Sequence, residues 1–251
     1  MTNSYIAIDC EFSWDEALHQ AHLSFDPTSK KHATAVKRVM AASAFEFSID
    51  DEGRVSTGPV VSWNEFDWGG EKAVIEQLFD YLRARPSGAV LSYGGLAVDI
   101  PVLLLAAMEY GIRLPDQLLD QPGRRGPRPH VDLGLQLKGG GRTWSHLSQV
   151  LLRIGVPVEL VRDKPSVLRP CQPKAWQNLA DHVELDVLLL AIAKVAWRVS
   201  QGAPVLRLEP AIIALIGGFL RQRRDHRAAS LLRKYAADLE NRYGAQLAIA
   251  A

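Results

Sequence analysis

The sequence contains few cysteines and no recognisable targeting segment. Cys10 and Cys171 are the only two among 251 residues, too few for a framework of disulfide bonds. The N-terminus lacks the basic start and apolar run of a signal peptide, and the longest nearly apolar stretch, 185–197, falls short of the roughly 20 residues that span a bilayer. The zinc-site spacings CxxC and HExxH are also absent. We therefore expect a cytoplasmic protein without a membrane segment or a zinc centre.

Net charge is nearly absent as well. Lysine and arginine number 29 and aspartate and glutamate 28, which gives a net charge of +1. This balance provides no global attraction for a polyanion, so any binding of nucleic acid must come from a local patch. Two groups of basic residues are candidates, although surface charges that serve only solubility would have the same composition. The first group is Arg124, Arg125, Arg128, Lys138, Arg142 and Lys164, and the second is Arg221, Arg223, Arg224, Arg227, Arg233 and Lys234.

The chain is long enough to bury a large core, and 47% of its residues are hydrophobic. Strand and helix patterns alternate along it and predict an α/β domain around a mixed sheet. Strands are predicted at 4–12, 44–49, 55–63, 89–93 and 130–135, helices at 71–85, 101–110, 143–154 and 174–199, and irregular structure at 16–38 and 156–173. Pro204 and Pro210 mark the change from this domain, residues 1–203, to a C-terminal helical extension, residues 204–251.

The first predicted strand carries two acidic residues on one face. Side chains alternate between the two faces of SYIAIDCEF, so Asp9 and Glu11 point the same way and Cys10 points the other way. Charges in a strand that is buried in a sheet need compensation, which a metal ion provides. An edge strand with one solvated face is the alternative, since it would show the same alternation.

Two further acids follow in a turn and in a helix. Asp99 comes after the glycine-rich turn of SYGGLAVDIP, where an ordinary helix N-cap is the alternative. Asp186 lies in LDVLLLAIAKVAW, which is apolar on almost every side and therefore unfavourable for a carboxylate unless something binds it. His182 is one helical turn earlier on the same face, where it can act as general base or orient a water. A hydrogen-bonded structural histidine is its alternative.

Four carboxylates are enough for hydrolysis of a phosphodiester by two divalent cations. One ion generates hydroxide from water and the other stabilises the leaving oxygen. Mg²⁺ is a hard cation that keeps several waters and takes only a few protein carboxylates. The sequence therefore predicts Asp9, Glu11, Asp99 and Asp186 as metal ligands and catalytic residues, with His182 as a further catalytic residue.

The segments AIDCEF, SYGGLAVDIPVLLLAAMEYGI, HVDLGLQLKGGGRTWSHLSQVLLRIGVPV and LADHVELDVLLLAIAKV carry a family resemblance. From about residue 4 to 200 the chain resembles the DEDD 3′→5′ exonuclease superfamily, and within it the stand-alone relatives of the family B DNA polymerase proofreading domain. The resemblance implies an RNase H-like fold with a five-stranded mixed sheet, two Mg²⁺ or Mn²⁺ ions, and release of nucleoside monophosphates from 3′ ends. The metal-binding positions of the family fall on Asp9, Glu11, Asp99 and Asp186.

The chain departs from the family pattern at three positions. Gly94 stands where the relatives have asparagine, and Val98 where they have phenylalanine. His182 is four residues before Asp186, which is the spacing of the tyrosine in one subgroup, whereas the histidine of the other subgroup is five residues before the aspartate. Asp132 matches an aspartate common in the relatives, and the resemblance implies a structural or substrate-adjacent role for it.

The expected function is that of a metal-dependent 3′→5′ exonuclease acting on single-stranded nucleic acid, with DNA favoured over RNA. A nucleic-acid-binding module of the same fold that has lost efficient chemistry is the first alternative, because Gly94 and His182 depart from the pattern. A structural protein whose tail packs on another subunit is the second. The sequence does not determine the oligomeric state.

Overall fold

The computed structural model describes residues 3–28, 33–119, 129–139, 141–162, 169–203 and 205–250. Four of the basic residues named above, Arg124, Arg125, Arg128 and Lys164, lie outside the described residues. Among the described helices, none combines the length and the apolar character needed to cross a membrane.

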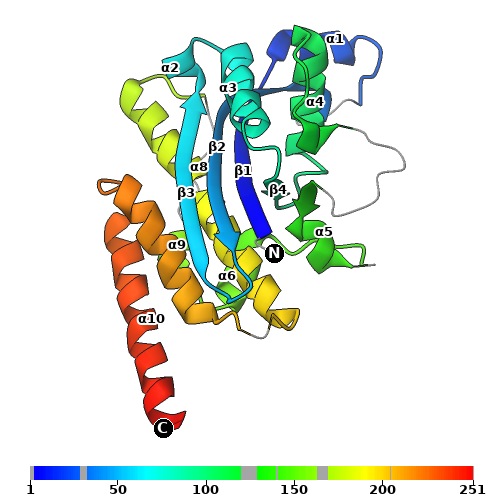
Figure 1. Ribbon diagram of the computed structural model, residues 1–251. Helices are drawn as coiled ribbons and strands as arrows, with labels where there is room; N and C mark the ends of the chain where they lie inside the picture. Colours follow the sequence, from blue (N-terminus) through cyan, green and yellow to red (C-terminus); the bar gives the residue numbers. More distant parts are fainter. Residues whose placement is uncertain are drawn as a thin grey trace.

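A five-stranded mixed sheet forms the centre of the chain (Figure 1). The strand order is β3-β2-β1-β4-β5, in which β1 pairs antiparallel with β2 and parallel with β4. The remaining pairs are β2 with β3, antiparallel, and β4 with β5, parallel. The strands are β1 (Asn3–Trp14), β2 (Lys37–Ile49), β3 (Val55–Asn64), β4 (Ala89–Ser92) and β5 (His130–Asp132). The mixed five-stranded sheet expected for an RNase H-like fold is thereby confirmed.

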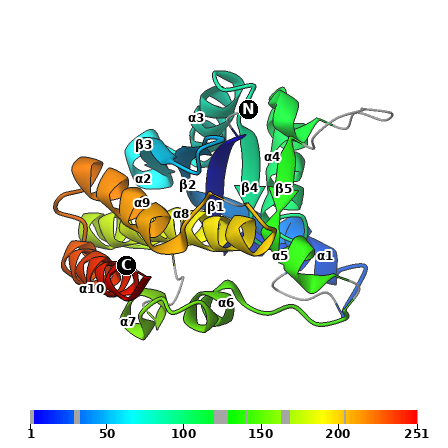
Figure 2. The same cartoon turned by 60° about the horizontal axis from the view of Figure 1, so that its bottom comes forward.

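Helices cover both faces of the sheet (Figure 2). Apolar residues at 74, 75, 78, 79 and 82 give α3 one buried stripe, which packs on the same face as α4. The long helix α8 and then α9 cover the opposite face, and α10 lies outside α9. These helices are α3 (Glu71–Arg83), α4 (Asp99–Tyr110), α8 (Pro173–Ser200), α9 (Leu208–Gln222) and α10 (Ala229–Ala250).

The alternation of β1 separates two hydrophobic cores. Ile6 and Ile8 pack with α3 and α4, whereas Tyr5 and Ala7 pack with α8 and α9. All four side chains are buried, because β1 is the central strand and has helices on both sides. The prediction that Cys10 points away from the face of Asp9 and Glu11 is confirmed, since Cys10 joins the α3–α4 core.

Several shorter elements differ from the prediction. The segment 16–38 is not irregular throughout: it contains a helix capped by Asp15, a 3₁₀ turn and the start of β2. The stretch 156–173 contains a helix, and the helix predicted from Thr143 begins four residues later, where His146 caps it. These short elements are α1 (Glu16–Leu23), η1 (Thr34–Val36), α2 (Glu65–Trp68), η2 (Asp116–Leu118), α5 (Leu133–Lys138), α6 (Leu147–Arg153) and α7 (Val158–Arg162).

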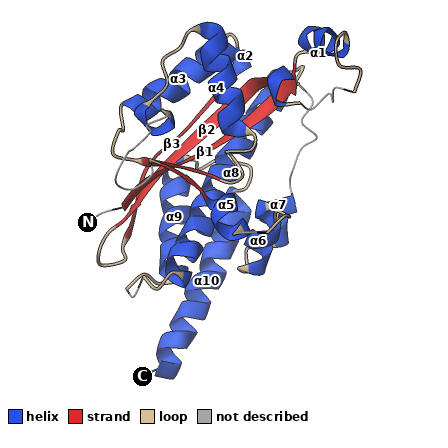
Figure 3. Cartoon of the chain, turned by 90° about the vertical axis from the view of Figure 1, so that its right-hand side faces the viewer, coloured by secondary structure: helices blue, strands red, loops and turns tan. Residues whose placement is uncertain are grey.

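The apolar part of the C-terminal extension packs against the sheet. Leu215, Ile216 and Phe219 of α9 are fully buried in the core on the α8 face. Phe219 meets Phe45 of β2 edge to face, at 6.2 Å between ring centroids. Beyond this contact, α10 runs away from the sheet towards the C-terminus (Figures 1 and 3).

Gly218 brings α9 directly onto β3, and this close approach can be tested. A Cβ at Gly218 would lie 2.1 Å from Thr57 Oγ1, and threonine is stiff about χ1. We expect Gly218→Ala to lower the free energy of unfolding by about 1–3 kcal/mol, the usual cost of overpacking, in urea titrations. Gly217→Ala is the control, because a Cβ there meets only the Arg221 side chain at 3.7 Å. That variant should gain up to about 1 kcal/mol of helix propensity, and equal losses at both glycines would contradict the close approach.

Candidate active site

The central strand carries its two acids towards α8. Asp9 and Glu11 alternate with Ala7, which packs in the α8–α9 core, and both acids are half-buried. Asp9 pairs in register with Ser43 of β2, and Glu11 pairs with Ala41. An irregularity in the register follows directly after Glu11. β1 is not an edge strand, because β2 and β4 flank it; the pairing with β4 covers residues 5–7, and Asp9 and Glu11 pair with β2.

Helix α8 places His182 and Asp186 against the acids of β1. His182 Nε2 lies 3.3 Å from Glu11 Oε1 and 3.5 Å from Asp186 Oδ2. The spacing of four residues within α8 puts His182 and Asp186 on one helical face, as predicted. His182 is only 2% exposed, so its ring is held by packing in this position. The structure thus brings together three of the five predicted site residues through direct contacts.

Asp99 reaches the same region from the other side of β1. A turn over 94–98 follows β4, and Asp99 is the first residue of α4, with Pro101 in the first helical turn. The N-cap position is occupied by Val98 without a side-chain cap, so the alternative of Asp99 as an ordinary N-cap is wrong. Asp99 is buried, with 9% of its surface exposed.

Burial and neighbouring carboxylates raise the pKa of Asp99 to about 7. Loss of solvation is the largest cause, followed by repulsion from Glu11, and Lys37 lowers the pKa in opposition. The thiol of Cys10 is affected in the same way: burial raises its pKa most, and the charges of Asp99, Asp9 and Glu11 raise it further. The charge of Glu11 raises the pKa of both Asp99 and Cys10, so negative charge is concentrated in this region. Charge of this kind favours a bound cation.

Asp132 holds the turn that leads to Asp99. Its Oδ1 accepts the backbone N–H of Gly94 at 2.8 Å, and its Oδ2 accepts that of Leu96 at 2.9 Å. The same carboxylate caps α5 by accepting the N–H of Leu135 at 3.1 Å. The strand predicted over 130–135 therefore ends at Asp132, because the cap starts a helix there. These bonds give Asp132 a structural role.

The donor set around His182 fits a divalent cation. One ligand atom each from Glu11, His182 and Asp186 lie within 4.8 Å of one another. Carboxylate oxygens suit Mg²⁺ and Mn²⁺, whereas an imidazole nitrogen suits iron, nickel, copper and zinc. His182 Nδ1 is buried and has no hydrogen-bond partner within the described residues. The polar contacts of the ring are therefore those of Nε2 with Glu11 and Asp186.

A second group of possible ligands on α8 is a structural network. Asp181, Glu184 and His226 also lie within 4.8 Å of one another. His226 Nδ1 accepts the N–H of Ala228 at 3.1 Å, and its Nε2 lies 2.8 Å from the carbonyl oxygen of Asp181, which can only accept. Both ring nitrogens are therefore occupied. Glu184 is bound by Arg223 at 2.7 Å, so this group is satisfied without a metal.

A polar cleft opens beyond the end of β1 that carries Glu11. It has a volume of about 600 Å³ and is lined by Ser13, Trp14, Asp15, Glu16, Arg38, Glu65, Glu71, Tyr110 and Arg169. Arg38 binds Asp15 and Glu71 across it, and also Glu109 of α4. The sequence did not indicate this ion-pair network, because its members come from elements that are far apart in the chain.

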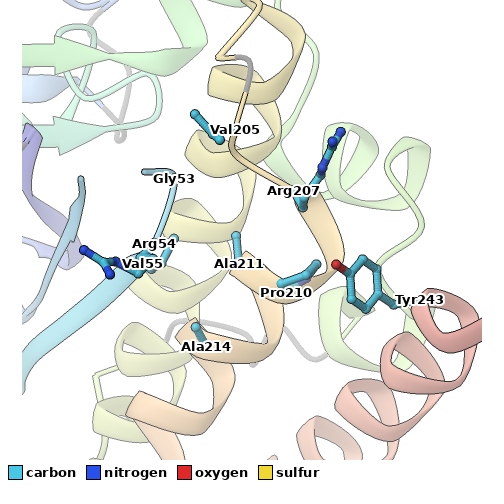
Figure 4. Close-up of a pocket in the computed structure, with 9 residues that line it drawn as sticks. All are labelled: Gly53, Arg54, Val55, Val205, Arg207, Pro210, Ala211, Ala214 and Tyr243. Atoms are coloured by element: carbon cyan, nitrogen blue, oxygen red, sulfur yellow. The ribbon is translucent and has the colours of Figure 1, made fainter. Parts of the chain in front are cut away.

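Another cavity, of about 330 Å³, lies at the opposite end of the sheet (Figure 4). The hairpin between β2 and β3 forms one wall, and Ile49 at its base pairs with Asn3 at the start of β1. The cavity is lined by Gly53, Arg54, Val55, Val205, Arg207, Pro210, Ala211, Ala214 and Tyr243. None of the predicted site residues is among them, so this cavity is separate from the carboxylates.

No family profile and no curated protein sequence matches the chain. Among solved structures, the family B DNA polymerase of the archaeon Pyrobaculum calidifontis is similar to this chain, with 14% sequence identity and a TM-score of 0.45. The alignment covers 88% of this chain and 29% of the polymerase chain. A zinc-bound complex of E. coli exonuclease I with single-stranded DNA matches 82% of this chain and 42% of its own, with 13% identity and a TM-score of 0.41. This chain thus spans less than half the length of either protein.

Asp99 should make the metal-free chain less stable as pH rises from about 4 to 7. Its pKa is about 7 in the folded chain against 3.8 ordinarily, so the folded state binds more protons in this window and its stability falls as pH rises. The full effect is on the order of 4 kcal/mol at 1.36 kcal/mol per pH unit. Urea titrations in EDTA at several pH values should show this slope in the native chain and a weaker one in Asp99→Asn. Identical slopes would contradict the raised pKa.

Removing one acceptor oxygen from Asp132 should destabilise the chain. Asp132→Asn puts an amide NH₂ where an oxygen now accepts a backbone N–H, and an unsatisfied buried N–H costs about 1–3 kcal/mol. Asp50→Asn is the control for the loss of charge alone, because both backbone N–H groups at Asp50 donate to Oδ1, which asparagine retains, and the site lies in the solvated β2–β3 turn. Urea unfolding should show the larger loss at Asp132. A loss at Asp50 as large as at Asp132 would argue against the buried turn as its cause.

Proposed function

We propose that this chain is a metal-dependent 3′→5′ exonuclease that hydrolyses phosphodiester bonds and releases nucleoside monophosphates. The observation that carries the proposal is the contact of His182 with both Glu11 of β1 and Asp186 of α8, at 3.3 and 3.5 Å. A buried histidine between two acids that are 175 residues apart in sequence is costly as structure alone, since carboxylates inside a fold require compensation. A cation at this position would provide it.

Asp9, Glu11, Asp99 and Asp186 would hold two Mg²⁺ or Mn²⁺ ions. When bound, the ions would supply a nucleophile from water and stabilise the leaving oxygen. The pKa of Asp99 is raised, so its charged form would gain from a nearby cation. Glu11 contributes from the strand, and Asp186 from the facing helix. The proposed ligands thus come from three elements, β1, α4 and α8.

His182 would move the proton of the attacking water. Its Nε2 is the nitrogen turned towards Glu11 and Asp186, so a water bound between these carboxylates is within its reach. The four-residue spacing to Asp186, which the tyrosine has in one subgroup of the resembled family, brings the imidazole to the carboxylates in this chain. The spacing is therefore compatible with a role as general base.

The preferred substrate would be the 3′ end of single-stranded DNA. The net charge of +1 gives no long-range attraction, so binding must come from contacts close to the site. Lys138 and Arg142 are the described members of the first basic group, and both follow the start of α5, which Asp132 joins to the turn before Asp99. Binding should accordingly weaken with salt, because such contacts release counterions.

The test is release of mononucleotides from single-stranded DNA and RNA labelled at either end, with Mn²⁺, Mg²⁺ or EDTA. The proposal requires metal-dependent shortening from the 3′ end. Asp9→Ala and Asp186→Ala should each lower the rate more than about 100-fold, because each removes charge that stabilises the transition state through the ions. His182→Ala should lower the rate about 100-fold or more, within the range of general base catalysis.

Asp181→Asn is the matched control for the acids of α8. Asp181 lies on the same helix, but its carboxylate receives Gln177 and the backbone of Arg227 on another face. Its rate should stay within a few-fold of native, provided that circular dichroism shows a folded chain. Retained DNA binding without degradation under any metal would favour the alternative, a catalytically inactive binding module. Loss in Asp181→Asn equal to that in Asp186→Ala would contradict the assignment of the site.

A further inference from the structure

Trp144 is a large aromatic side chain exposed beside the turn that leads to Asp99. It lies between α5 and α6, and 37% of its surface is exposed. The absence of a side chain at Gly134 allows the ring to lie directly against the backbone. A Cβ at Gly134 would lie 2.6 Å from Trp144 Cζ3, and a Cβ at Gly94 would lie 3.8 Å from the same atom. The ring therefore packs by one edge on the start of α5 and on the turn after β4.

The position of Trp144 is tied to the carboxylate site through its neighbours. Tyr93 donates its hydroxyl to the carbonyl oxygen of Ser145, the residue after Trp144. Asp132 accepts the N–H of Gly94, on which the ring rests, and the same turn continues to Asp99. The ring is thus held at a defined place relative to the acids while much of its surface remains open to solvent.

The surroundings of the ring are apolar and positively charged. Lys138 Nζ lies over the ring at 5.1 Å from its centroid, within the range of a cation–π contact. Leu96, at the tip of the turn, is 45% exposed, and Arg142 is exposed two residues before Trp144. Proteins that bind single strands combine aromatic side chains, on which bases stack, with cations that follow the backbone phosphates.

We propose that Trp144 is a stacking platform for a base of single-stranded DNA whose 3′ end enters the carboxylate site. This inference rests on the proposed exonuclease function and adds a substrate contact to it. The base takes the place of the Lys138 ammonium over the ring, and the ammonium pairs with an adjacent phosphate. Every base has a π-face, so the contact binds without preference for sequence.

Equilibrium binding in EDTA tests the platform independently of catalysis. The probes are a fluorescently labelled oligothymidylate and an abasic oligomer of the same length. Trp144→Ala should weaken binding of the oligothymidylate about tenfold, the order expected for one stacked base, and should leave the abasic oligomer nearly unaffected. Trp144→Phe should retain most of the affinity, because a phenyl ring also stacks. Quenching of tryptophan fluorescence on binding should be smaller in Trp144→Phe than in the native chain.

Trp68→Ala is the matched control, since Trp68 of α2 is 44% exposed and lies on a different element. Its affinity should equal that of the native chain. Native affinity in Trp144→Ala, or an equal loss for the abasic oligomer, would overturn the platform while leaving the exonuclease proposal standing. A native chain that binds neither probe would also overturn the platform, whereas the exonuclease proposal is decided by the cleavage assay with metal. A loss in Trp144→Ala that Trp144→Phe does not recover would also reject stacking as the cause.

Discussion

The packing of α8 against β1 is the constraint on which the rest of the structure depends. β1 is the central strand, and its acidic positions face α8 because strand alternation leaves no other face for them. α8 places His182 and Asp186, one turn apart, opposite these acids, so that polar groups meet inside an otherwise apolar interface. A shift of α8 by one residue would rotate it by about 100° and separate these groups. The register between helix and strand is therefore specified by electrostatics as well as by packing.

The turn before α4 is held by hydrogen bonds to its backbone. One buried carboxylate, Asp132, accepts backbone N–H groups from two segments and so holds the conformation of the turn. Gly95 lies close to Ser92: a Cβ at Gly95 would be 2.4 Å from Ser92 Oγ. Asp99 is consequently delivered by backbone hydrogen bonds and close approach. The acids of β1 and α8 are thus positioned by side-chain packing, and Asp99 is positioned by the hydrogen bonds of Asp132.

Much of this arrangement could be predicted from the sequence, because periodicity reports burial. The alternation along residues 4–12 predicts the first strand, and the order of strand and helix patterns along the chain predicts the mixed sheet. The prediction is wrong where a single cap defines an element: a helix, not a strand, follows Asp132, and the helix predicted from Thr143 begins after His146. The ion pairs of Arg38 could not be predicted either, since no local pattern links residues that meet only in the folded chain.

Helix α8 presents polar residues on two of its faces. His182 and Asp186 face the strand, while Asp181 and Glu184 face the segment between α9 and α10, where His226 and Arg223 satisfy them. The same few turns of helix therefore serve two neighbourhoods that must each balance buried charge. α8 packs against both α9 and β1, so it connects the C-terminal extension to the strand that carries Asp9 and Glu11. In evolutionary terms, the C-terminal extension and β1, which both pack on α8, are expected to vary together.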